Sequence, residues 1–249
     1  MAEPILTLTT DFGLVDHYVG VMKGVILEIC PHVRIVDISH QVTPFAIAEG
    51  AYLIAQACAF FPKNTVHVAV IDPGVGSERR AILVEAAGQY FVGPDNGVFS
   101  LVMAREKHKT RVITNDRYFH TPVSRTFQGR DVFAPVGAHL TAGVPAARMG
   151  KNFPGVVLPD LERPQVLHID RFGNIVTNLP ADDLQIKRVS LEIDGTKISS
   201  IASHYAEVKP GKLFLIEGSS GFIEVSMNRG SAAERIGCSA GAIVRVRKR

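Results

Sequence analysis

The sequence predicts an α/β fold with a mainly parallel sheet in its N-terminal part, followed by a compact all-β domain. Strand and helix patterns alternate over about the first 140 residues, which is typical of a parallel sheet with helices on its faces. A stretch with three prolines and no clear periodicity follows at residues 150–164, and only short strand patterns come after it. We therefore expect an N-terminal domain over residues 1–152 and a C-terminal domain over residues 165–249.

The first strand and helix set the pattern for the N-terminal domain. Ile5–Thr9 is apolar enough for a strand, and a helix with Asp16 as its N-cap follows, with apolar residues at helical spacing. This helix is expected to end at Cys30, because the next residue is a proline. By the same patterns we expect strands at 34–38, 66–71, 81–86, 90–92 and 111–113, and helices at about 46–60, 98–105 and 131–141. Asp131 is the expected N-cap of the last of these helices.

The C-terminal domain is predicted from short strand patterns separated by turns. Asp194-Gly195 lies between two of them and indicates a tight hairpin. The expected strands cover residues 165–169, 175–177, 189–193, 196–201, 213–216, 222–226 and 242–246.

The composition is that of an ordinary globular chain of 249 residues, 46% hydrophobic and 20% charged, without Trp. The 27 Lys and Arg residues exceed the 24 Asp and Glu residues by only three, without a basic stripe, so no nucleic-acid partner is expected. The three cysteines are dispersed, and no CxxC, HxH or HExxH spacing occurs, so neither a disulfide framework nor a metal site is indicated. No signal peptide or bilayer-length apolar stretch is visible, and we expect a cytoplasmic protein without a membrane partner.

Two aspartates follow strands of the expected parallel sheet, where ligands bind in such folds. Asp11 follows the first strand and Asp72 follows Val66–Ile71, and glycines come soon after each. The glycine-rich stretch after Asp72 lacks the Lys-Ser/Thr of a P-loop, so nucleoside triphosphate binding is weakly supported. Arg79 lies seven residues after Asp72 around this turn, which favours a carboxylate–guanidinium pair of either structural or functional kind.

For the other polar segments, composition alone favours a structural role over a functional one. Arg130 and Asp131 can pair on the surface, and His139 lies on an apolar helix face as a core histidine would. The turns at residues 170–174 and 219–221 can be ordinary hairpins. No GxSxG motif is present, so a serine triad is not indicated.

Six motifs occur together in one order along the chain. They are Thr9–Gly13 (TTDFG), Val42–Phe45 (VTPF), Val70–Gly76 (VIDPGVG), Gly93–Gly97 (GPDNG), Thr126–Asp131 (TFQGRD) and Phe172–Asn174 (FGN). With them the chain, from Ile5 to Val246, resembles the S-adenosylmethionine (SAM) hydrolases, or SAM hydroxide adenosyltransferases, relatives of the fluorinases and chlorinases. The resemblance implies an α/β domain, a C-terminal β-barrel-like domain, and a homotrimer that binds SAM between the N-domain of one subunit and the C-domain of its neighbour.

The resemblance also implies substrate-binding residues. Asp11 matches the carboxylate that binds the ribose hydroxyls, and Phe45 matches an aromatic side chain that packs on the nucleoside. Asp170 matches the carboxylate that holds the methionine ammonium group, and Asn174 matches the asparagine that reads adenine. Ser219 and Ser220 fall where the family binds the methionine carboxylate.

The implied reaction is hydrolysis of SAM to adenosine and L-methionine, by attack of water or hydroxide on ribose C5′, without a cofactor. Asp72 and Arg79 match two members of the hydrolases' Asp-Arg-His set, and the halogenases have other residues there. The third member is replaced by Gln128, whose amide cannot exchange a proton near pH 7.

Three alternatives stay open from the sequence. The Gln128 replacement suits a SAM- or adenosine-binding protein with little catalysis. Asp11 and Asp72 could instead hold Mg²⁺ in a metal-dependent hydrolase. A third alternative within the same family resemblance is a SAM-dependent halogenase.

Overall fold

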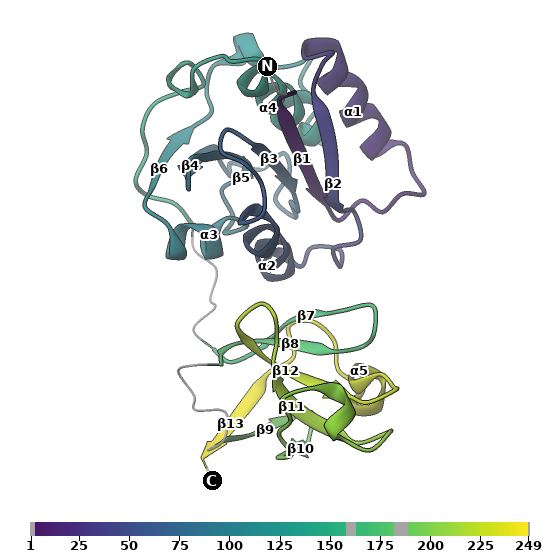
Figure 1. The fold of residues 1–249 in the computed structure, drawn as a ribbon. Coiled ribbons are helices and arrows are strands. Elements are labelled where there is room, and N and C mark those ends of the chain that lie inside the picture. The colour runs from purple at the N-terminus through teal and green to yellow at the C-terminus, as the bar shows by residue number, and fades with distance from the viewer. Residues whose placement is uncertain (1–2, 158–162, 182–188, 249) are drawn as a thin grey trace. The chain divides into compact units, whose positions relative to one another are not determined.

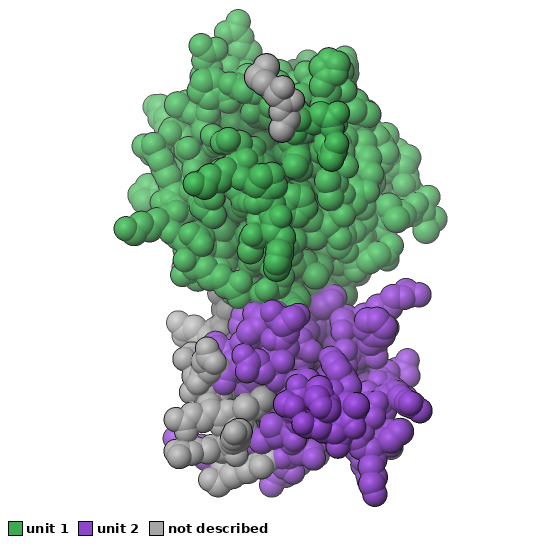
Figure 2. All heavy atoms as spheres, in the orientation of Figure 1, with its two compact units in different colours: residues 1–159 green, residues 160–249 purple. Residues whose placement is uncertain are grey.

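The computed structural model describes residues 3–157, 163–181 and 189–248. The chain forms two compact units, residues 1–159 and residues 160–249, which Figure 2 shows in different colours. Within the described residues, no helix has the length and apolar character needed to cross a membrane.

The first unit is built on a six-stranded sheet with the order β2-β1-β3-β5-β4-β6 (Figure 1). Strands β2, β1, β3 and β5 are parallel, whereas β4 pairs antiparallel with both β5 and β6. The strands are β1 (Ile5–Thr10), β2 (Arg34–Ser39), β3 (Val66–Val70), β4 (Ala81–Ala86), β5 (Gln89–Pro94) and β6 (His108–Val112). This confirms the prediction of an α/β fold with a mainly parallel sheet.

Helices cover both faces of this sheet. Helix α1 (Tyr18–Ile29) packs with α4 (Ala134–Thr141), and α2 (Ile47–Cys58) packs with α3 (Ser100–Arg105). Strand β3 divides its side chains between the two resulting cores, because successive residues of a strand point to opposite faces. Val66, Val68 and Val70 lie in the α1/α4 core, whereas Ala69 and the following Ile71 lie in the α2/α3 core.

Two predicted helix caps are wrong. Asp16 is exposed, and α1 begins one residue later than expected, with His17 as its N-cap and no capping side-chain bond. Asp131 lies inside a π-helix, Gly129–Phe133, that continues into α4. Its carboxylate is fully buried and accepts hydrogen bonds from Arg130 and from the backbone N–H of Ser124. The carboxylate therefore does not cap the N–H groups at the start of the helix. The Arg130–Asp131 pair therefore exists, but its carboxylate is not on the surface.

The second unit contains two antiparallel sheets around one core. Asp194 and Gly195 join β9 to β10 and both have positive φ, +45° and +77°, as the hairpin prediction requires. The four-stranded sheet has the order β11-β12-β8-β7, and the three-stranded sheet has the order β10-β9-β13. The strands are β7 (Val166–Ile169), β8 (Ile175–Pro180), β9 (Val189–Ile193), β10 (Thr196–Ile198), β11 (Leu213–Glu217), β12 (Phe222–Met227) and β13 (Val244–Lys248).

The prediction of an all-β domain missed one short helix, α5 (Ala232–Ile236). Ser231 caps its start by accepting the N–H of Glu234, and Gly237 ends it in the left-handed conformation. Five residues are too few to show a helical period in the sequence. Short 3₁₀ turns cover Asp116–Tyr118 and Ala146–Arg148 in the first unit and Tyr205–Glu207 in the second.

Candidate active site

A pocket of about 250 Å³ lies in the first unit at the carboxyl ends of β1 and β3. We call it the N-terminal pocket. Four residues with predicted site roles, Asp11, Phe45, Asp72 and Gln128, line it together. The remaining lining residues are Phe12, Pro44, Val70, Val75, Thr126, Phe127 and Gly129. The two aspartates that follow strands of the sheet, Asp11 and Asp72, thus line one pocket.

Asp11 is half-buried, and the segment before α2 binds its side chain by a backbone hydrogen bond. Its Oδ2 accepts the backbone N–H of Phe45 at 2.9 Å. Burial raises the pKa of this carboxyl, the Phe45 hydrogen bond opposes that rise, and the negative charge of Asp72 adds to it. Phe45 itself has a φ of +69°, and 69% of the residue is exposed at the pocket.

Asp72 and Arg79 form a close ion pair across the glycine-rich turn. Arg79 Nε lies 2.9 Å and 3.0 Å from the two carboxylate oxygens of Asp72, and Nη2 donates to Oδ2 as well. Both side chains are largely buried, with 4% of Asp72 and 11% of Arg79 exposed. The turn needs a glycine at position 76, where φ is +78° and a Cβ would come within 2.3 Å of the Arg125 carbonyl oxygen.

Gln128 completes this cluster from a distant part of the chain. Its Oε1 accepts a hydrogen bond of 2.6 Å from Nη2 of Arg79. Because the amide oxygen is used in this way, the amide NH₂ remains as the donor end of the side chain. The cluster therefore combines a buried carboxylate and an amide donor, which line the pocket, with the guanidinium group of Arg79, which binds both of them but is not among the lining residues.

Aromatic side chains also line this pocket and pack on one another. Phe12 and Phe127 both line it, with ring centroids 6.0 Å apart in an edge-to-face arrangement. Tyr18 contacts both rings, at 5.7 Å and 5.1 Å. Sequence reasoning assigned Phe12 and Phe127 no role, although both lie within quoted motifs.

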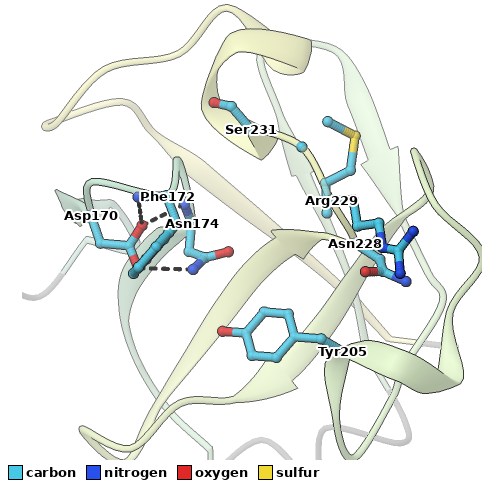
Figure 3. A pocket seen from close by; sticks show the side chains of 9 residues that line it. Asp170, Phe172, Asn174, Tyr205, Asn228, Arg229 and Ser231 are labelled. Carbon is cyan, nitrogen blue, oxygen red and sulfur yellow. Dashed lines mark hydrogen bonds between the residues drawn. The ribbon is translucent and has the colours of Figure 1, made fainter.

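A second pocket, of about 730 Å³, lies in the second unit, and we call it the C-terminal pocket (Figure 3). Asp170 and Asn174 come from the turn between β7 and β8. Asp170 Oδ1 accepts the backbone N–H groups of Phe172 and Asn174 at 2.8 Å and 2.9 Å. Its Oδ2 accepts the side-chain amide of Asn174 at 2.8 Å. These bonds fix both predicted side chains relative to each other.

Four further polar or aromatic residues from outside the 170–174 turn line this pocket and were not predicted from the sequence. Tyr205 points its ring toward the turn of Asp170 and Asn174, and the segment after β12 supplies the rest (Figure 3). These are Asn228, Arg229 and Ser231. The Asn-Arg-Gly composition of this segment signals a turn but gives no sign of its partner turn. Burial raises the pKa of the Tyr205 hydroxyl, so the neutral side chain lines the pocket.

Ser219 and Ser220 lie elsewhere. Their turn joins β11 to β12 at the end of β8, where Phe222 is opposite Pro180, whereas the Asp170 turn precedes the start of β8. Ser219 lines a separate hollow with residues of the 201–203 and 217–221 segments. The structure thus brings Asp170 and Asn174 together but does not add the two serines to them.

Two family models match this arrangement of an α/β unit and a β unit. The N-terminal domain of SAM hydroxide adenosyltransferase matches residues 6–150, and its C-terminal domain matches residues 164–245. The chain belongs to the SAM hydroxide adenosyltransferase family, which confirms the resemblance drawn from the six motifs.

Relatives of known name cover nearly the same length. A Methanocaldococcus jannaschii protein named (R)-S-adenosyl-L-methionine hydrolase is 42% identical over 236 residues, 89% of this chain and 88% of its own. A Thermus thermophilus protein of the same name is 36% identical over 263 residues, 98% and 99% of the two chains. A fluorinase from Nocardia brasiliensis is 25% identical over 293 residues, 98% and 97% of the two chains.

Among solved structures, a conserved protein from Thermotoga maritima matches with a TM-score of 0.89 and 35% identity. The match covers 98% of this chain and all of the other.

Proposed function

We propose that this protein hydrolyses SAM to adenosine and L-methionine by attack of water or hydroxide on ribose C5′. The observation that carries the proposal is the Asp72–Arg79 pair, bound to Gln128 at the wall of the N-terminal pocket. The names of the relatives support the same reaction, and they specify the (R) epimer at sulfur. We extend that preference to this protein.

The proposed step forms one C–O bond and breaks one C–S bond. The nucleophilic oxygen binds C5′, the electron pair of the C–S bond stays on sulfur, and methionine leaves as a neutral thioether. Because the thioether leaves neutral, no general acid is needed for it. When water is the nucleophile, the proton that it loses passes through the Asp72 carboxylate to solvent. The cationic sulfonium and the developing hydroxide neutralise each other, and a pocket shielded from water favours this transition state over separated charges.

Some residues around the nucleophile accept a hydrogen bond from it, and others donate a hydrogen bond to it. Asp72 accepts a hydrogen bond from the attacking water, because a carboxylate has lone pairs beyond those that Arg79 engages. Arg79 stabilises the charge that develops on the oxygen. Gln128 binds Arg79 through its oxygen and donates from its NH₂ group to the nucleophile, orienting it without taking its proton.

Asp11 binds the ribose hydroxyls in this proposal. Its position beside Asp72 in one pocket supports this role, since ribose C5′ must lie within reach of both groups. Phe45 packs against the nucleoside, and its exposed ring at the pocket supports this assignment. A nucleophile held roughly 3 Å from C5′ gains the rate advantage of an oriented reaction.

The C-terminal pocket binds the other parts of the substrate in this proposal. Asn174 reads adenine and Asp170 holds the methionine ammonium group, as the family resemblance implies. The same resemblance assigns the methionine carboxylate to Ser219 and Ser220, which lie outside the C-terminal pocket, at the other end of β8. We propose a cytoplasmic homotrimer in which the N-terminal pocket of one subunit and the C-terminal pocket of a neighbour share one SAM. The exposed ring of Phe172, 78% exposed at the C-terminal pocket, supports a surface that is covered on assembly. A mass of three 27.0 kDa chains in sedimentation equilibrium tests the trimer.

The direct test of the reaction is incubation with each SAM epimer, followed by chromatography for adenosine and methionine. We expect both products in equal amounts from the (R) epimer. SAM that is bound but not cleaved would favour the alternative of a SAM-binding protein with little catalysis, which the glutamine at position 128 suits. Chlorodeoxyadenosine formed with chloride would indicate a halogenase, and loss of activity with a chelator would indicate the Mg²⁺-dependent alternative.

A further inference from the structure

The turn of Asp95 and Asn96 binds both ends of the loop that carries Asp72 and Arg79. It belongs to the GPDNG motif, which begins at the end of β5 and leads toward α3. Neither residue lines the N-terminal pocket. The proposed function gives this motif no role, although it contacts the residues directly before Asp72 and directly after Arg79.

Asn96 holds the start of that loop. Its Nδ2 donates a hydrogen bond of 2.8 Å to the carbonyl oxygen of Ile71, the residue directly before Asp72. Its Oδ1 accepts the backbone N–H of Val98 at 3.2 Å, which stabilises its own turn. The amide NH₂ group thus binds the catalytic loop, and the amide oxygen binds the turn itself.

Asp95 holds the end of the same loop. Its Oδ2 accepts a hydrogen bond of 2.8 Å from Nε of Arg80, the residue directly after Arg79. The backbone N–H of Asp95 donates to the carbonyl oxygen of Arg80 at 2.9 Å, so this residue is fixed through both side chain and backbone. The Asp95 side chain is only 1% exposed, which strengthens its pairing with a guanidinium group.

We propose that Asn96, with Asp95, is a positioning residue for hydrolysis, which sets the distance and orientation of Asp72 and Arg79 relative to the substrate. This inference rests on the proposed function. The loop between residues 72 and 79 makes its ion pair at its own two ends, so the pair alone does not fix the loop against the sheet. The contacts of Asn96 and Asp95 supply that second constraint, and misplacement of a reacting group by about 1 Å can cost about 10²-fold in rate.

Asn96→Asp is the sharpest variant, because it keeps the acceptor for Val98 and replaces the donor to Ile71 by a carboxylate oxygen, which repels that carbonyl oxygen. A residue that served only the turn would tolerate this change, since aspartate accepts backbone N–H groups as well as asparagine does. We expect kcat for SAM to fall about 10- to 100-fold. The affinity for adenosine and the number of binding sites, measured by calorimetry, should stay within about twofold, which excludes a loss of folded protein. Asp95→Asn, which keeps the shape but weakens the bond to Arg80, should lower kcat in the same direction.

Asn115→Ala provides a control at an asparagine that makes the same pair of hydrogen bonds away from the pocket. Asn115 also donates from Nδ2 to a distant carbonyl, that of Arg148 at 2.8 Å, and also accepts an N–H two residues on, that of Arg117. Neither Asn115 nor Arg148 lines the N-terminal pocket, and we expect this variant to keep wild-type kcat. Wild-type kcat in Asn96→Asp, or an equal loss of kcat in Asn115→Ala, would overturn the positioning role.

A crystal structure of Asn96→Asp separates this inference from the proposed function. If the wild-type protein releases no adenosine, the proposed function fails, and the structure of the variant alone decides the inference. We expect displaced Asp72 and Arg79 side chains. An unchanged Asp72–Arg79 pair would overturn the inference.

Discussion

Arg79 donates hydrogen bonds to both carboxylate oxygens of Asp72, from a position seven residues further along the chain. A buried carboxylate without a partner would be costly, and the guanidinium group offsets that cost while fixing the orientation of the carboxylate. The same guanidinium binds Gln128, so the three side chains form one unit. Removing one member should therefore disturb catalysis more than substrate binding.

Asp72→Ala should abolish hydrolysis and leave adenosine binding nearly intact, because Asp72 is assigned to the water and not to the nucleoside. Loss of a group of this kind costs about 10²- to 10⁴-fold in rate. Steady-state turnover and adenosine calorimetry on the same preparation provide the measurement. Wild-type turnover in this variant would remove Asp72 from the mechanism.

Asp11→Ala should weaken adenosine and SAM alike. Hydrogen bonds to a charged carboxylate contribute about 1.5–3 kcal/mol each, so affinity should fall at least about tenfold. Calorimetry that found unchanged adenosine affinity would contradict the ribose-binding role.

The pH dependence of adenosine binding follows from the same residue. Burial raises the pKa of Asp11, and only the ionised carboxylate accepts from both ribose hydroxyls. Affinity should be complete above this raised pKa and decline as the pH falls through it, at a higher pH than an ordinary aspartate would give. The Asp11→Ala variant should lack this decline.

Gln128→His tests the position at which this chain departs from the hydrolase pattern. A neutral imidazole can accept from Arg79 through its unprotonated nitrogen and donate to the nucleophile through its N–H, and unlike an amide it titrates near neutral pH. Turnover should exceed that of the wild-type protein. It should also increase as the pH rises through the histidine pKa of about 6.5, because the protonated ring would repel Arg79. Lower turnover with an unchanged pH profile would indicate that the amide of Gln128 is already the adapted group.

His67 should make the stability of the first unit depend on pH. Its Nδ1 lies 2.7 Å from Oγ1 of Thr7, and burial lowers its pKa to about 4. In the unfolded chain the ring takes up a proton below about 6.5, whereas the folded protein takes it up only near 4. The free energy of unfolding should therefore decrease as the pH falls from 6.5 to 4, by at most about 3 kcal/mol from this group.

His67→Gln should flatten that part of the pH dependence. Urea unfolding followed by circular dichroism at several pH values gives the measurement. An equally steep dependence in the variant would assign the effect to other groups.

The sequence predicted most of the first unit because long periodic segments carry the information. The placement of Asp11 and Asp72 at the ligand-binding edge of the sheet followed from strand ends alone, since ligands lie beyond the carboxyl ends of parallel strands. Gln128 is 49 residues from Arg79, and only the family resemblance placed the two together.

In the second unit, contacts depend on strand order, which alternating patterns do not encode. Sequence patterns therefore did not show that Tyr205 and Ser231 join Asn174, or that Ser219 lies at the other end of β8. The burial of Asp131 was missed for a related reason, because its partner Ser124 lies in an irregular segment.

The most direct test of the proposed hydrolysis is a reaction with (R)-SAM in water enriched in oxygen-18, followed by mass spectrometry of the products. Attack of water on C5′ predicts one heavy oxygen in the 5′-hydroxyl of adenosine and none in methionine. Asp72→Ala, assayed in parallel, should form no labelled adenosine. Adenosine without the label, or no adenosine at all from the wild-type protein, would contradict the proposed reaction.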